Sequence, residues 1–139
     1  MAVETTVGGV AFLAGRVLFG AVLAFMGVNH FLSVDEMAGY AASKGVPAPR
    51  LGVVATGVLL LVGGASLVLG VYPIVGAAAL VVFFVVATPA IHDFWNVEDP
   101  EARQSEITDF LKNVALTGGA LVLLGVGAGS WPYAVGLGL

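Results

Sequence analysis

The sequence contains no cysteine, and its charged residues are few. The lack of cysteine excludes a disulfide scaffold, a cysteine-ligated zinc finger and thiol-based redox chemistry. Only 10% of the residues are charged, whereas a soluble domain has about 25%. The five Lys and Arg residues are scattered and outnumbered by nine Asp and Glu. The chain therefore has neither a basic surface for nucleic acid nor a polybasic anchor for anionic lipid.

Apolar residues are abundant: 59% of the 139 residues are hydrophobic, and the mean hydropathy is +1.04. A transmembrane helix needs about 20 apolar residues to cross about 30 Å of hydrocarbon. Four such spans fit, over about 9–32, 51–71, 73–94 and 110–127. No linker is long enough to divide the chain, so residues 1–139 form one membrane domain. We predict an all-α membrane protein, an antiparallel bundle of four transmembrane helices.

A short helix is predicted between the first and second spans. Ser33 and Glu36 have the spacing of a capping box, and Gly45 is placed to end a helix over about 34–44. One face of this helix carries Met37, Tyr40 and Ala41. We expect the helix to lie along the membrane interface, with this face against headgroups or the ends of the other helices.

The third and fourth spans carry their own start and stop signals. Pro89 removes a backbone hydrogen bond and predicts a kink in the last two turns of the third span. Asp99 and Pro100 predict the start of the last helix, so that residues 100–109 precede the membrane. Small residues recur along the spans and predict close helix contacts, at Ala11/Gly15, Gly20/Ala24, Gly63-Gly64 and Gly118-Gly119.

Orientation follows from the Lys and Arg residues near the span ends. Lys44, Arg50, Arg103 and Lys112 all lie in the first-to-second and third-to-fourth connections. Because basic loops stay on the cytoplasmic side, we predict a multi-pass protein of the plasma membrane with both termini outside.

Polar residues of all four spans gather at one membrane face in the predicted topology. They are Asn29, His30, Arg50, His92, Asp93, Trp95, Lys112 and Asn113. Such a set predicts a site for the head of a quinone or similar lipophile, with hydrogen-bond donors that hold a carbonyl oxygen at the mouth of an apolar slot. The alternative is that residues at span ends simply meet headgroups and water.

A metal or haem site at this face is disfavoured. His30, His92 and Asp93 supply two histidines and a carboxylate. However, neighbouring residues on a helix point about 100° apart, and no further ligand has diagnostic spacing. Histidines that bind haem between helices lie deeper in the bundle. We therefore predict no metal, and a quinone remains the cofactor to test.

Arg16 lies in the first span, about 21 Å along the helix from His30. The second span and the apolar bodies of the third and fourth contain no acidic residue to pair with it. We expect Arg16 to snorkel outward. The alternatives are binding to backbone carbonyls or contact with an anionic lipid or substrate.

Across nearly its whole length the chain resembles the DoxX family of small membrane proteins. The matching strings are Gly15-Arg16, Gly27-Val28-Asn29-His30-Phe31, Gly45-Val46-Pro47, Gly63-Gly64 with Gly70, His92-Asp93-Phe94-Trp95, and 111–119 with Lys112-Asn113. The resemblance implies a four-helix membrane bundle. Some relatives resemble subunits of membrane oxidoreductases, including a thiosulfate:quinone type. Many carry a glutamate where this chain has Leu60, so any role of that glutamate is absent or altered here.

These observations lead to one function and two alternatives. The first is a membrane subunit of an oxidoreductase complex that binds a quinone or other lipophile. It would be surrounded by membrane lipids, form a homo-oligomer and dock a soluble redox partner at the 95–110 loop. The chain has no self-sufficient catalytic motif, so whether it is itself an enzyme stays open. The alternatives are a non-redox protein that binds or transports a lipid or small molecule, and a structural membrane partner.

Overall fold

A computed structural model describes residues 5–127, 129 and 131–135. The described chain is helical, and its helices follow the predicted order closely. Four helical segments are long and apolar enough to cross a membrane. The elements are α1 (Thr6–Leu32), α2 (Val34–Ser43), α3 (Pro49–Leu69), α4 (Pro73–Ile91), the 3-10 helix η2 (Phe94–Asn96) and α5 (Pro100–Val126).

Local signals account for most helix boundaries. The Asp99 side chain accepts a hydrogen bond from the Ala102 backbone N–H at 2.8 Å, as expected for the N-cap of α5. The capping-box interpretation of α2 is wrong in part, because Ser33 is the N-cap but its side chain makes no capping bond. Gly45 ends α2 as predicted, with a φ of +79°, a left-handed conformation that glycine adopts without strain.

The helix α4 continues through Pro89 and ends soon after it. The helix α4 ends at Ile91, two residues beyond Pro89, whereas the sequence predicted a span to about residue 94. A proline ring clashes with the carbonyl group four residues earlier and leaves that group without its hydrogen bond. The residues after the proline are not affected in this way, so two of them stay helical. The chain then turns through η2 into α5.

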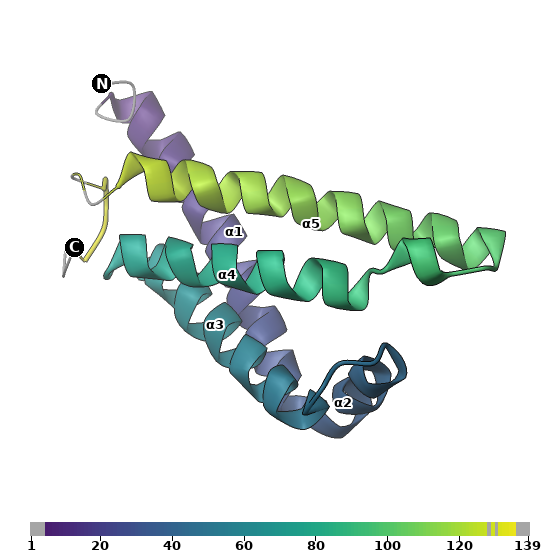
Figure 1. Ribbon diagram of the computed structural model, residues 1–139. Helices are drawn as coiled ribbons and strands as arrows, with labels where there is room; N and C mark the ends of the chain where they lie inside the picture. The colour runs from purple at the N-terminus through teal and green to yellow at the C-terminus, as the bar shows by residue number, and fades with distance from the viewer. Residues whose placement is uncertain (1–4, 128, 130, 136–139) are drawn as a thin grey trace.

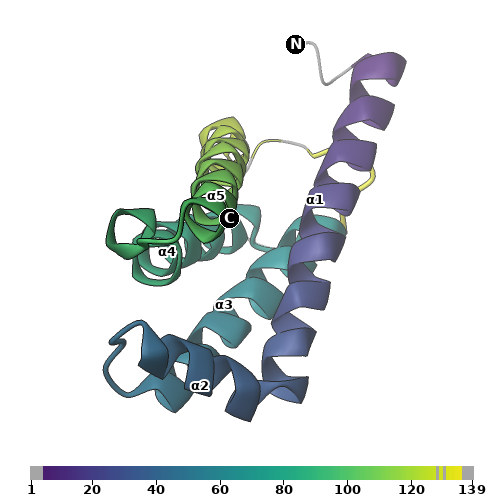
Figure 2. The ribbon, with the colours of Figure 1, turned by 90° about the vertical axis from the view of Figure 1, so that its right-hand side faces the viewer.

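The long helices are arranged as two pairs. The helices α1 and α3 lie side by side, as do α4 and α5, and α3 also packs on α4. In Figures 1 and 2 the α4–α5 pair crosses the α1–α3 pair obliquely, and α2 lies across the lower end of α1 and α3. The core is formed mainly where the pairs meet, by Leu60, Leu67, Leu80, Phe84, Ala120 and Leu123.

Glycines permit the close contact of α1 with α3. A Cβ atom at Gly64 would lie 2.6 Å from the Ala24 backbone nitrogen, and one at Gly20 would lie 2.6 Å from the Gly64 carbonyl oxygen. The prediction of close packing is therefore right at Gly20 and Gly64. At Gly15 and Gly118 a Cβ would meet nothing within 4 Å, so these two positions make no close helix contact among the described residues.

Candidate functional site

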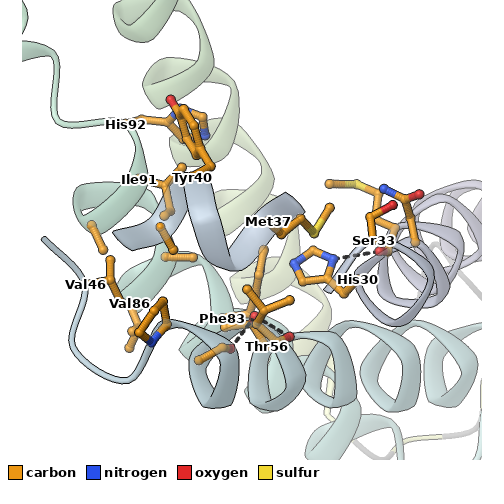
Figure 3. Close-up of a pocket in the computed structure, with 18 of the residues that line it drawn as sticks. His30, Ser33, Met37, Tyr40, Val46, Thr56, Phe83, Val86, Ile91 and His92 are labelled. Carbon is orange, nitrogen blue, oxygen red and sulfur yellow. Dashed lines mark hydrogen bonds between the residues drawn. The ribbon is translucent and has the colours of Figure 1, made fainter. Parts of the chain in front are cut away.

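A cavity of about 600 Å³ lies where the two helix pairs diverge, beside α2 (Figure 3). We call it the α2 cavity. Its apolar wall includes Met26, Met37, Val46, Val53, Phe83, Val86, Ala87, Ala90 and Ile91. Its polar lining is Asn29, His30, Ser33, Glu36, Tyr40, Thr56, His92 and Asn113. A mainly apolar space with a few polar groups is the usual character of a small-molecule site.

His30 lies at the α1–α3 end of the cavity. Its Nδ1 is 2.8 Å from the Met26 carbonyl oxygen one turn earlier in α1. Its ring meets the Phe83 ring edge to face, with the ring centroids 6.2 Å apart. Gly57 of α3 allows this placement, because a Cβ there would lie 2.8 Å from the His30 Cβ. Backbone and glycine together fix the imidazole against the cavity (Figure 3).

His92 lies at the other end, where α4 stops. Its Nδ1 is 2.8 Å from Oε2 of Glu106 on α5. The Tyr40 hydroxyl donates to the other carboxylate oxygen, Oε1, at 3.0 Å. One carboxylate therefore joins α2, the end of α4 and α5, and it orients a histidine that lines the cavity.

Lys44 connects the carboxylate of Glu106 to a second carboxylate, that of Asp93. Its Nζ lies 2.6 Å from Oδ1 of Asp93 and 3.8 Å from Oε1 of Glu106. The hydrogen bond to Asp93 raises the pKa of the Lys44 ammonium above its usual range. Burial, and then the hydrogen bond to Glu106, raise the pKa of the Tyr40 hydroxyl. The Lys44 and Asp93 side chains are only 14% exposed, so this pair is partly shielded from water.

The structure brings four of the predicted residues to the α2 cavity: Asn29, His30, His92 and Asn113. The other four predicted residues of this face lie outside it. Asp93 and Trp95 line a neighbouring shallow hollow. Arg50 pairs with Asp35, and Lys112 lies 3.4 Å from Asp109, both at exposed positions.

Sequence reasoning missed most of the polar residues that α2 and α5 place at or beside the cavity. Tyr40 was assigned only to a face of the short helix, and neither Lys44 nor Glu106 was selected as a site residue. One signal was available in α5: Glu106 and Asn113 are seven residues apart, so they share a helix face. The approach of α2 to α4 and α5 is a long-range contact that no local pattern indicates.

Arg16 occupies a separate site at the opposite end of the α1–α3 pair. The residue is 1% exposed. Its Nη1 donates to the carbonyl oxygens of Leu67 and Val68 at 2.9 and 2.8 Å, and its Nη2 donates to those of Pro132 and Tyr133 at 3.1 and 2.8 Å. Leu67 and Val68 belong to the last turn of α3, whose carbonyl groups lack helical partners and carry negative dipole charge.

The expected snorkelling of Arg16 is wrong, and its alternative, binding to backbone carbonyls, is what the structure shows. Trp131 covers the guanidinium, whose carbon lies 5.7 Å from the ring centroid. Phe12 packs edge to face on Trp131, with centroids 5.0 Å apart. The terminal nitrogens together donate four hydrogen bonds to carbonyl oxygens, whereas Nε is buried and has no partner among the described residues. Snorkelling fails because α3 and the C-terminal segment bring acceptors to the arginine.

Across residues 5–127, 129 and 131–135, no three His, Asp or Glu side chains come together as metal ligands would. Phe94, Trp95 and Phe110 form an aromatic cluster beside η2, which places Trp95 half-exposed on the outer surface.

Comparison with known proteins gives one match. The DoxX family model matches residues 11–93, more than half of the chain. The matched range includes Arg16, both histidines, Lys44 and Asp93, but not α5 with Glu106 and Asn113. No curated protein and no solved structure matches the chain.

Proposed function

Since the chain belongs to the DoxX family, as the match over residues 11–93 shows, we propose that this membrane protein binds the head of a quinone or similar lipophile in the α2 cavity. The observation that carries the proposal is an apolar cavity of about 600 Å³ with a histidine at each end. Apolar walls suit a ring and the start of a chain, and a few polar groups suit the oxygens of the head.

The proposal extends to the role of a subunit in a membrane oxidoreductase complex. A bound quinone would supply two-electron redox chemistry, while this chain's residues bind and orient it. The resemblance to DoxX relatives supports this role. We place the soluble redox partner at residues 95–110, where exposed Glu98, Asp99 and Glu101 precede or begin α5. Reversing the charges of Glu98 and Glu101, which keeps the Asp99 cap of α5, should then reduce co-purification of the partner.

Binding is tested with the whole protein in nanodiscs, by titrating an alkyl benzoquinone and reading adducts by native mass spectrometry. Ala87→Phe fills the cavity with a ring, and it should weaken binding by tenfold or more. The matched controls are Arg50→Ala and Lys112→Ala, which the structure places outside the cavity. Melting temperatures establish that each variant is folded. Wild-type affinity in a folded Ala87→Phe protein would eliminate the proposal.

A non-redox lipid carrier is the second candidate, and it is favoured by the two methionines, Met26 and Met37, in the cavity wall. Methionine is flexible and adapts to ligands of varied shape. A retained phospholipid, with no saturable quinone binding, would select this function. In that case Ala87→Phe should abolish lipid retention.

We also propose that the four apolar segments cross the plasma membrane in alternating directions, with both termini outside and α2 along the inner interface. The lack of native cysteine makes this simple to test, because a single introduced cysteine reports accessibility. In right-side-out vesicles, an impermeant maleimide should label Thr6→Cys and spare Ser105→Cys. The reverse pattern would invert the orientation, and labelling of both would contradict the alternating topology.

The native mass spectra of the protein in nanodiscs also measure its oligomeric state. We propose a homo-oligomer in which the outer faces of α1 and α5, which carry exposed Leu18, Phe25 and Val122, contact a second copy instead of lipid. A monomer mass in nanodiscs at working concentration would contradict this.

A further inference from the structure

Both histidines of the cavity form their hydrogen bond through Nδ1, and in each case the partner is an acceptor. Nδ1 of His30 faces the Met26 carbonyl oxygen, which can only accept, so this nitrogen carries the proton. Nδ1 of His92 faces the Glu106 carboxylate, which also receives the Tyr40 hydroxyl hydrogen and lies near the Lys44 ammonium. A carboxylate surrounded by donors accepts from the imidazole as well. Both histidines therefore keep their proton on Nδ1.

The position of the proton on Nδ1 determines which hydrogen bond each neutral ring can form with a ligand. With Nδ1 protonated, Nε2 carries a lone pair and accepts a hydrogen bond. Among the described residues no hydrogen bond reaches Nε2 of either His30 or His92. Figure 3 shows the second ring nitrogen of His30 turned away from the α1 backbone, on the side of Met37. At its two histidines the cavity thus presents acceptors, where a carbonyl-bearing head would need donors.

The histidines mark two ends of one cavity. His30 packs on Phe83, and His92 follows Phe83 by nine positions, which corresponds to about 13 Å along a helix. The wall between them consists of apolar side chains of α4, including Val86, Ala87 and Ala90. A ligand that satisfies both ends therefore needs an apolar body with a hydrogen-bond donor at each end.

We infer that the α2 cavity selects a hydroxyl-bearing ligand, an aromatic or aliphatic diol of which a hydroquinone is the redox-active example, over the corresponding dione. This inference rests on the proposed binding function and specifies its ligand class. It reverses the expectation that the site holds a carbonyl oxygen. A dione oxygen placed at either histidine would meet an acceptor and form no hydrogen bond there, which is costly in an apolar cavity, so a dione could be held only by the amide donors of Asn29 and Asn113.

Three matched probes test the inference on the protein in nanodiscs near neutral pH. They are an alkyl para-hydroquinone kept reduced without oxygen, the corresponding alkyl para-benzoquinone, and the dimethyl ether of the hydroquinone. The ether keeps the ring and oxygens but cannot donate, and it takes no part in redox chemistry. The hydroquinone should bind at least tenfold more tightly than either of the others.

Glutamine variants of the two histidines test whether the preference for the hydroquinone comes from hydrogen bonding or from the shape of the cavity. A glutamine amide can turn either its oxygen or its N–H toward the ligand. His30→Gln and His92→Gln should therefore bring the ratio of hydroquinone to ether affinity towards one, without loss of ether binding. Lys112→Gln, outside the cavity, is the control and should keep the wild-type ratio.

The outcomes distinguish the two proposals. If none of the probes binds saturably, the proposed function is wrong and the inference falls with it. If all three bind with similar affinity, the binding function stands and the inference is overturned. A ratio that persists in both glutamine variants would likewise overturn it, because the preference would then have another origin.

Discussion

Polar residues have different surroundings at the two ends of the α1–α3 pair. At one end, Arg16 is buried and its terminal N–H groups all bind carbonyl oxygens of the chain. At the other end, His30 and His92 each bind one partner through Nδ1 and face a cavity. The Arg16 Nε also lacks a partner, but it is buried among side chains. The comparison teaches that a polar residue in an apolar span indicates ligand binding only where its free donor or acceptor lies at a cavity.

The arrangement of the helices explains this difference. Near Arg16 the two pairs meet, with Phe19 of α1 beside Gly119 of α5 and Trp131 packed on Phe12. Towards α2 the pairs diverge, and α2 bridges them through Lys44 and Tyr40. The converging end is filled by side chains and backbone, and the diverging end holds the cavity.

The largest expected effect is the loss of the arginine site. Arg16→Leu would leave four buried or part-buried carbonyl groups without this donor, and should lower the free energy of unfolding by on the order of 3 kcal/mol. Melting in detergent, followed by tryptophan fluorescence, measures the loss. Because the site lies far from the α2 cavity, the folded fraction should keep its ligand affinity.

Arg16→Lys is the matched control for charge. An ammonium is a compact donor and cannot reach both carbonyl pairs as the planar guanidinium does, so an intermediate loss is expected. Unchanged melting of Arg16→Leu would show that the carbonyl site does not stabilise the fold.

A smaller loss of stability is expected when the close contact between α1 and α3 is disturbed. Gly64→Ala would force its Cβ against the Ala24 backbone and should cost about 2 kcal/mol. Gly118→Ala meets nothing within 4 Å and should be neutral or slightly stabilising, because alanine favours a helix over glycine. Chemical unfolding of the two variants in parallel gives the difference. Equal losses would contradict the close contact assigned to Gly64.

The smallest effect is a loss of stability at alkaline pH that arises at the cavity end. Folding raises the pKa of Lys44 above 10.5, chiefly through Asp93, and that of Tyr40 above 10.0, chiefly through burial. A raised pKa means that the folded state holds the proton more tightly. This stabilisation is therefore complete below the ordinary pKa and is lost as pH rises through the raised one.

Melting temperatures between about pH 8 and pH 11 measure this loss. Lys44→Met and Tyr40→Phe should each flatten the alkaline decline, and Lys44→Met should also lower stability at neutral pH because Asp93 loses its partner. Lys112→Met, whose only described ion pair is the exposed one with Asp109, should leave the decline unchanged. A decline that persists in both cavity-end variants would place its origin elsewhere.

Much of the fold was predictable because its signals are local. Hydropathy located the four long helices, and Asp99, Pro100 and Gly45 marked boundaries within a residue or two. The candidate site was predictable only in part. His30, His92, Asn29 and Asn113 were selected by their position at span ends, and they do line one cavity. Arg50 and Lys112 share that membrane face in the predicted topology, yet their side chains project to the exposed surface, which span position alone does not reveal.

The sequence by itself determined that this is a helical membrane protein of the DoxX family, because apolar length and turn residues act over a few helical turns. Only the tertiary structure decided the roles of its polar residues. Whether Arg16 reaches carbonyl groups, and whether Glu106 orients His92, depends on which groups, distant in the sequence, come within about 3 Å of each side chain. Those distances are set by the convergence of the helix pairs at one end and their divergence at the other.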